Sequence, residues 1–332
     1  MDWALYSFFR NHVLYPLYVS VRLGCPKGTE CSARYLNALR KRLVPGWKSA
    51  ERFCASGQDC LLKSVPYTYL KTTPLIPTVS PVTSYYRTEG EGESLLILHG
   101  GWGYEVYPFD RQVEVLRTHW KVIMPDRSGY GRSTHISWGL PSDFHYLAAK
   151  ETLAFLDSLN IQRTAVWGHS DGAVIGAIAA IMAPDRISGL ILESFHYYAA
   201  KNHSRAFYEQ LAYRPETLGD SLCGKFAVAH GQEYWKTIIS SQGRAWLDIG
   251  EKTTRPDDDL YGGTLQKLAT PSLFIHGRND PRTEPGELDA VRRAVQKCDM
   301  RILNAYHSPH SEKAAADVTT KIALQFLQTI GR

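Results

Sequence analysis

The chain has 332 residues, of which 44% are hydrophobic and 21% charged, a balance typical of a globular protein with a sizeable core. Its net charge of +5 comes from the first 52 residues, where nine Lys and Arg stand against three acidic residues, so the rest of the chain carries −1. A nearly neutral body argues against nucleic acid as a partner.

Residues 1–75 are expected to form an N-terminal extension that is aromatic and basic. Its first 23 residues are mostly apolar, but Arg10 and Pro16 interrupt them, so they make a poor membrane-spanning helix. A cleavable signal peptide also fits badly, because Asp2 stands where Lys or Arg is expected. Two interpretations stay open: residues 1–45 contact an anionic membrane surface, or they pack on the rest of the chain. The location is open, with a cytoplasmic or membrane-associated one favoured over secretion.

Four of the six cysteines fall in this extension, at Cys25, Cys31, Cys54 and Cys60. Five residues separate the members of each pair, which exceeds the usual spacing of about two to four residues between zinc ligands. Zinc is therefore disfavoured against disulfides or reduced thiols. No metal and no cofactor are expected in the chain.

Beyond a proline-rich connector at 72–81, short apolar runs alternate with helix-length segments. We expect strands at 94–98, 121–124, 164–167, 189–192, 272–275 and 301–303. Continuous apolar runs of this kind predict an α/β fold in which helices flank a mostly parallel central sheet. The long stretch between the fourth and fifth strands predicts an inserted helical cap at 201–264, leaving a core of 76–200 and 265–332.

The motif GHSDG at 168–172 joins the strand expected at 164–167 to a helix rich in small residues. A sharp turn from strand to helix crowds the backbone, and glycines two positions before and after the central residue relieve the crowding. The hydroxyl of Ser170 is then presented beside the N-terminus of the helix, whose free amides stabilise negative charge. Ser170 is therefore the candidate nucleophile.

From about Thr83 to Thr329 the sequence resembles the α/β-hydrolase family, and its GHSDG motif is similar to that of the biphenyl-hydrolase-like esterases. HGGWG at 99–103 resembles the family's oxyanion loop, and the segment 126–133 resembles its glycine-rich loop. The resemblance implies that the backbone amides of Gly101 and Asp171 bind the oxyanion that develops during acyl transfer.

A serine hydroxyl is a weak nucleophile until a base takes its proton, so a histidine and an orienting acid must come from elsewhere in the fold. The turn HGRNDP after the 272–275 run resembles the family's acid turn and implies Asp280, with Glu284 in reserve. YHSPHSEK near the C-terminus resembles the family's GHSPHxE segment and implies His307 as the base, with His310 as the alternative.

The side chain of Asp171 would add unfavourable negative charge close to the oxyanion, and a neighbouring group that offsets this charge is one expectation. Two interpretations stay open: the resemblance to the biphenyl-hydrolase-like esterases implies that the carboxylate receives the ammonium group of a substrate, or it makes structural hydrogen bonds to neighbouring loops. His99 and His276 follow strands and are expected to be structural, and His169 is expected to point away from the substrate.

The cap is dense in aromatic side chains, which together with Trp102 suit a hydrophobic or aromatic ligand. The candidate substrate-binding residues are Trp102, Trp235 and Trp246. The sequence thus predicts a serine hydrolase that cleaves an ester, lactone or thioester of a small hydrophobic or aromatic molecule through an acyl-enzyme. The same triad also suits C–C bond hydrolysis or acyl transfer, and a non-catalytic binding protein on this scaffold is the rival class. The expected partner is a small-molecule substrate, and the oligomeric state is open.

Overall fold

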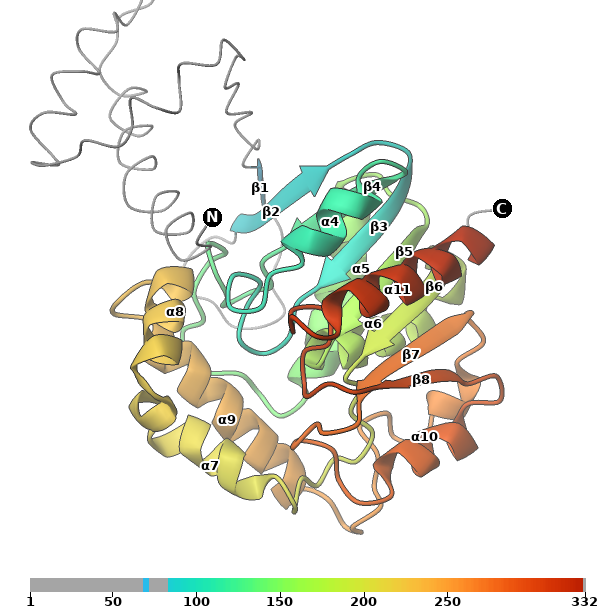
Figure 1. Ribbon diagram of the computed structural model, residues 1–332. Coiled ribbons are helices and arrows are strands. Elements are labelled where there is room, and N and C mark those ends of the chain that lie inside the picture. Colours follow the sequence, from blue (N-terminus) through green and yellow to red (C-terminus); the bar gives the residue numbers. More distant parts are fainter. Residues whose placement is uncertain (1–67, 72–82, 331–332) are drawn as a thin grey trace, which may run out of the picture. The chain divides into compact units, whose positions relative to one another are not determined.

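The computed structural model describes residues 68–71 and 83–330, which contain an eight-stranded sheet of order β1-β2-β4-β3-β5-β6-β7-β8 (Figure 1). The strands are β1 (Thr68–Lys71), β2 (Thr83–Glu89), β3 (Glu93–Leu98), β4 (Trp120–Pro125), β5 (Thr164–His169), β6 (Ile187–Glu193), β7 (Ser272–Gly277) and β8 (Asp299–Leu303). The pairs β1–β2 and β2–β4 are antiparallel, and the other neighbours are parallel. The predicted α/β fold with a mostly parallel sheet is confirmed.

Helices cover both faces of this sheet. The helices are α4 (Asp110–Leu116), α5 (Phe144–Ser158), α6 (Asp171–Met182), α7 (Arg205–Tyr213), α8 (Asp220–His230), α9 (Trp235–Glu251), α10 (Glu287–Ala294) and α11 (Ala316–Ile330), with short 3₁₀ turns at Pro184–Arg186, Pro215–Leu218 and Leu265–Lys267. Successive side chains of β3 point to opposite faces. Leu95 and Ile97 pack in one apolar cluster with α4 and α11, whereas Leu96 and Leu98 pack in another with α5 and α6.

The antiparallel edge formed by β1 and β2 is not predicted by the apolar runs. Along β2 only Tyr85 and Arg87 are buried, at alternate positions, while the remaining residues are partly exposed. A strand of this kind has no continuous apolar run by which it can be recognised. Because β1 lies within the range 1–75 that was assigned to the N-terminal extension, the sheet begins before that boundary.

Helices α7, α8 and α9 lie within the range 201–264 predicted for a cap, and we call them the cap. Figure 1 shows them grouped beside one end of the sheet, apart from the helices that cover its faces. In α9 the buried positions Ile238, Gln242, Trp246 and Ile249 recur every three or four residues, so one face of this helix is turned inward. Gln242 and Trp246 on that face line the cavity described below.

Some predictions fall outside the described residues: the membrane contact of residues 1–45, the pairing of the four N-terminal cysteines and the connector at 72–81. In the described part, Cys223 and Cys298 are free and half-buried. None of the helices in that part combines the length and the apolar character needed to cross a bilayer.

Candidate active site

Ser170 occupies the sharp turn between β5 and α6. Its φ of 55° and ψ of −120° lie in a region that side-chain-bearing residues rarely adopt, at a cost of about 1–3 kcal/mol. A Cβ atom at Gly168 would lie 2.2 Å from the carbonyl oxygen of Gly172, and one at Gly172 would lie 2.1 Å from that of Leu98. Only glycine fits at either position, so these two glycines permit the turn that exposes the serine.

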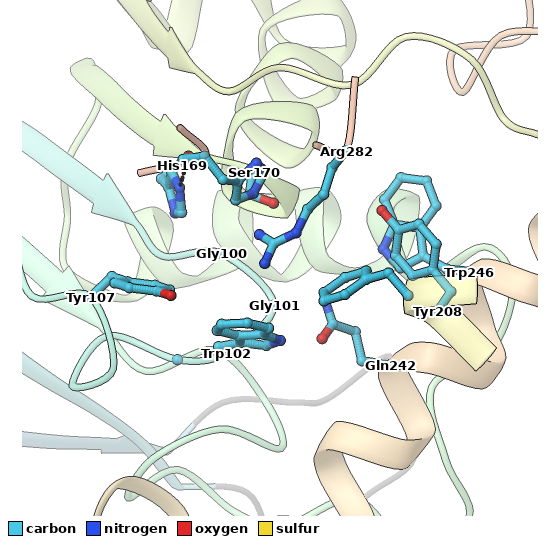
Figure 2. A pocket seen from close by; sticks show the side chains of 13 residues that line it. Gly100, Gly101, Trp102, Tyr107, His169, Ser170, Tyr208, Gln242, Trp246 and Arg282 are labelled. Carbon is cyan, nitrogen blue, oxygen red and sulfur yellow. Dashed lines mark hydrogen bonds between the residues drawn. The ribbon is translucent and has the colours of Figure 1, made fainter. Parts of the chain in front are cut away.

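Ser170 lines a cavity between the turn after β3, the segment after β7, and helices α7 and α9 (Figure 2). The other lining residues are Gly100, Gly101, Trp102, Gly103, Tyr107, His169, Phe207, Tyr208, Gln242, Trp246, Arg282 and His307. Of the three tryptophans predicted to bind substrate, Trp102 and Trp246 are therefore brought to the cavity. Trp235 is not, because it is buried within the cap and stacks on Phe226 with 5.7 Å between ring centroids.

His307 and Asp280 form a close pair, with Nδ1 of His307 2.7 Å from Oδ2 of Asp280. Burial opposes ionisation of Asp280, but the neighbouring histidines, His307 foremost, hold the pKa of this carboxyl far below its usual range. Burial and the charge of Arg282 lower the pKa of His307 against the pull of Asp280, so the ring is neutral at pH 7. Its Nε2 is buried without a hydrogen-bond partner among the described residues, and this nitrogen is therefore able to take up a proton.

A second histidine that the sequence analysis did not single out, His196, lies at the serine. Its Nε2 is 3.4 Å from Oγ of Ser170, and its ring lies nearly parallel to that of His307 with 5.7 Å between centroids. Burial, Lys201 and His307 lower its pKa well below the usual value. His196 follows β6, the parallel neighbour of β5, so its place three residues beyond a strand end was the signal that could have revealed it.

The two reserve candidates are engaged elsewhere. The Nδ1 atom of His310 lies 2.7 Å from Oε1 of Glu193, and its Nε2 lies 3.1 Å from the carbonyl oxygen of Tyr107. Glu284 accepts hydrogen bonds from the hydroxyl of Ser204 and from two backbone amides of the segment before α7. Neither residue is placed to serve Ser170.

His169, Glu193 and His310 are the described residues whose ligand atoms gather closely enough, within 4.8 Å, to hold a metal ion. They are already hydrogen-bonded, since Nε2 of His169 lies 3.0 Å from the carbonyl oxygen of His307 and His310 binds Glu193. Burial would raise the pKa of Glu193, but His310 lowers it to about 2. The cluster is thus a buried polar network that fixes the backbone of His307 against the sheet.

The carboxylate of Asp171 connects the turn to the cap. It lies 2.9 Å from Nε2 of Gln242, 3.1 Å from Nε1 of Trp246 and 3.2 Å from Nε2 of His145, with the guanidinium of Arg127 at 4.0 Å. Burial would raise its pKa, but these donors, His145 foremost, lower it to about 2. The geometry fits the structural interpretation of Asp171, because both oxygens are occupied and the side chain does not line the cavity.

The turn after β3 brings its backbone against Ser170. A Cβ atom at Gly100 would lie 3.1 Å from Cβ of Ser170, and one at Gly101 would lie 1.4 Å from Nε2 of Gln242. A side chain at Gly101 would therefore collide with the cap. Because both positions lack side chains, the main chain of this turn can approach the serine and the cap closely.

His99 and His276 have the structural surroundings expected of them. Nδ1 of His99 donates to the carbonyl oxygen of Gly100 at 2.7 Å, and its Nε2 accepts from the amide of Arg127 at 3.0 Å. Burial and Arg127 lower the pKa of His99, in keeping with a neutral ring. Nε2 of His276 lies 2.6 Å from Oγ1 of Thr283, which holds the turn that carries the acid.

A serine at a glycine-flanked strand-to-helix turn, facing a histidine–carboxylate pair across a capped cavity, defines the α/β-hydrolase class. The model of the family described as the alpha/beta hydrolase fold matches residues 93–314. The chain belongs to this family and is a hydrolase.

Known relatives agree with this assignment. Serine hydrolase BPHL from Homo sapiens is 26% identical over 255 residues, which cover 75% of this chain and 84% of that protein. Pimeloyl-(acyl-carrier protein) methyl ester esterase from Aliivibrio fischeri is 36% identical over 108 residues, or 32% of this chain and 38% of that protein. Among solved structures, a thermophilic esterase from Thermogutta terrifontis aligns with a TM-score of 0.59 at 20% identity, covering 80% and 100% of the two chains.

Burial of neutral histidines makes the fold sensitive to acid. Burial lowers the pKa of His99, His145, His169, His196, His230, His276 and His307. In the unfolded chain these rings take up protons near pH 6.5, so unfolding consumes protons and the free energy of unfolding falls as the pH drops. His169 and His230, whose pKa values are lowered to about 3 and about 4, should each contribute a loss of about 1 kcal/mol between pH 7.5 and 5.5, and the other five histidines act in the same direction.

Asp126 has the opposite effect on the free energy of unfolding. Burial raises its pKa to about 7, so below pH 7 the folded protein binds this proton more readily than the unfolded chain does. Urea unfolding at a series of pH values measures the net effect. Replacing the exposed His119 by Gln should leave the profile unchanged. A free energy of unfolding that stays constant down to pH 5.5 would refute this account.

Replacing Asp171 by Asn tests the link between turn and cap. An amide has one oxygen to accept the three donors and presents its own donors to them, so we expect a loss of about 2–4 kcal/mol in the free energy of unfolding. The matched control is Asp185→Asn, at an exposed carboxylate after α6, which should change stability by less than about 0.5 kcal/mol. Urea unfolding at pH 7.5 compares them, and equal stabilities would mean that Asp171 does not hold the cap.

Proposed function

We propose that this hydrolase is a serine hydrolase in which Ser170 is the nucleophile, His307 the base and Asp280 the orienting acid. The observation that carries the proposal is the unoccupied Nε2 of a neutral His307, whose Nδ1 is bound to Asp280, in the same cavity as the strained Ser170. A histidine held in this way by a carboxylate keeps its proton on Nδ1 and accepts the serine proton on Nε2.

The reaction is acyl transfer to water. His307 removes the proton of Ser170 as the serine oxygen attacks the carbonyl carbon, and the amides of Gly101 and Asp171 bind the oxyanion. Asp171 is the first residue of α6, so its N–H has no acceptor within the helix and lies at the positive end of the helix dipole. Donors of this kind contribute about 3 kcal/mol each. His307 then protonates the leaving group, and water releases the acyl-enzyme.

The aromatic walls of the cavity favour a hydrophobic or aromatic portion of an ester, lactone or thioester. Trp102 stacks on Tyr107 at 5.6 Å, and Tyr208 stacks on Trp246 at 5.2 Å. Figure 2 shows the first pair on one side of the cavity and the second on the other. Flat side chains on two sides suit a small substrate with an apolar body. Trp102 and Trp246 are thus the substrate-binding tryptophans that we propose.

The features of this site favour a catalytic protein over a non-catalytic binding protein. The turn at Ser170 carries backbone strain, and the pair of Asp280 with His307 requires the burial of a charge. The strain at Ser170 lowers stability without adding a contact for a ligand, whereas both features serve acyl transfer. The relatives named as serine hydrolase and esterase support the same choice.

The nucleophile is tested with a fluorophosphonate probe and a p-nitrophenyl ester of a short aliphatic acid. We expect Ser170→Ala to abolish labelling and to lower ester hydrolysis by about 10³-fold or more, because no other group forms the acyl-enzyme. Ser158→Ala, at an exposed serine that ends α5, is the matched control and should label as the wild type does. Persistent labelling of the Ser170 variant would refute the assignment.

The base is tested by comparing His307, which lines the cavity with Ser170, and His196, whose Nε2 lies 3.4 Å from the serine oxygen. His307 has Asp280 as a partner, whereas Nδ1 of His196 is buried without one. We therefore expect His307→Gln to lower kcat by about 10³-fold or more and His196→Gln by about tenfold or less. Circular dichroism checks that both variants fold. Equal losses in the two variants would contradict the choice of His307.

A further inference from the structure

Arg282 is a cation in the cavity for which the described residues supply no acidic partner. It follows Asp280 by two residues and lines the cavity beside Ser170. Figure 2 shows its guanidinium in the space between Ser170 and Trp102. The Nε atom is buried without a hydrogen-bond partner, and no carboxylate of the described residues forms an ion pair with this side chain. Its closest described companions are the rings of Phe207 at 4.4 Å and Trp102 at 4.7 Å.

Buried cations elsewhere in the described part of the chain do have carboxylates. Lys201, which lies near the same cavity over Trp246, is paired with Glu287. Arg87 lies 3.5 Å from Asp110, and the guanidinium of Arg127 lies 4.0 Å from Asp171. The fold thus compensates its interior cations, as burial of charge requires. Arg282, which is partly buried, has no such carboxylate among the described residues and lines the cavity beside Ser170.

The carboxylates near Arg282 are committed to other groups. Asp280 binds His307 through one oxygen and the backbone amide of Arg282 through the other. Asp171 binds the cap, and Glu284 binds the segment before α7. The two aromatic rings attract the guanidinium but accept no N–H of its planar fork in the way that a carboxylate does. The donors that face the cavity are left for a ligand.

We infer that Arg282 binds a carboxylate carried by the substrate, so that the preferred substrate is an ester, lactone or thioester with an anionic group close to its reacting carbonyl. A guanidinium matches the two oxygens of a carboxylate with two parallel hydrogen bonds, and the adjacent rings of Phe207 and Trp102 hold it in place. Its charge acts within the cavity, since after burial it is the main influence that lowers the pKa of His307. The inference names the substrate class of the proposed serine hydrolase and rests on that function.

The kinetic test compares p-nitrophenyl hemisuccinate, hemiglutarate and hemiadipate with the uncharged butyrate, valerate and hexanoate esters. The full chain should prefer an anionic ester over the neutral ester of similar length. In Arg282→Gln the ratio of the two kcat/KM values should fall by about 10- to 100-fold, and Arg282→Lys should retain part of it. Arg278→Gln, at an exposed arginine of the same turn, is the matched control and should keep the wild-type ratio.

The outcomes separate the possible roles of Arg282. If Arg282→Gln lowers kcat/KM for anionic and neutral esters equally, the guanidinium assists the oxyanion or the packing and the inference fails. An ester of 4-aminobutyrate, which carries an ammonium group, should show the opposite sign, with its relative kcat/KM rising in Arg282→Gln. A preference for anionic esters that survives in Arg282→Gln would also overturn the inference.

A binding measurement separates this inference from the proposed hydrolysis. Glutarate and 4-phenylbutyrate are titrated into the full chain by calorimetry, with 4-phenylbutanol as the neutral counterpart. We expect a carboxylate to bind at least tenfold more tightly than the alcohol, and this difference to vanish in Arg282→Gln while it persists in Ser170→Ala. Carboxylate binding without any hydrolysis would defeat the proposed function alone, and hydrolysis without carboxylate selectivity would defeat the inference alone.

Discussion

The close approach of α6 to the sheet is the constraint on which the rest of the site depends. The helix begins directly after Ser170, and the backbone at Gly172 lies so near the carbonyl oxygen of Leu98 that no Cβ atom fits between them. This contact forces the serine into a strained conformation, and the surrounding core must outweigh that strain. The core does so with α6, which is buried along nearly its whole length between β3, β5 and β6. Core packing thus stabilises the strained turn that presents the Ser170 hydroxyl to the cavity.

The same turn also positions the cap. Asp171 directs its carboxylate away from the cavity, toward Gln242 and Trp246 of α9 and toward His145 of α5. Its backbone amide and its side chain therefore have different tasks, since the amide is the proposed oxyanion donor and the carboxylate binds the cap. A negative charge next to a developing oxyanion is unfavourable, and four donors of the protein offset it here. Side chains of the protein itself therefore offset the negative charge of Asp171.

The sequence predicted those parts of the fold and site whose signals are local. Continuous apolar runs revealed the six parallel strands, and the glycine pattern around Ser170 revealed the turn, because both depend on neighbours in the chain. The antiparallel strands β1 and β2 have no such run. His196 and Arg282 acquire their significance only when β5, β6 and β7 are placed side by side, since each follows a different strand. Trp235 shows the converse, because aromatic density in the cap does not reveal which ring faces the cavity and which packs on Phe226.

The charged side chain that faces the cavity is the cation Arg282, whereas the sequence had suggested the anion Asp171. Asp171 adjoins Ser170 and suggested a place for a cationic group, yet its carboxylate is bound by neighbouring protein donors and does not line the cavity. Arg282, two residues beyond the acid Asp280, keeps its charge uncompensated and lowers the pKa of His307. An anionic substrate bound there would offset that charge and favour protonation of His307 at the moment when the base receives the serine proton. Binding and proton transfer would then be coupled through one guanidinium, which gives a physical reason for leaving it without a protein partner.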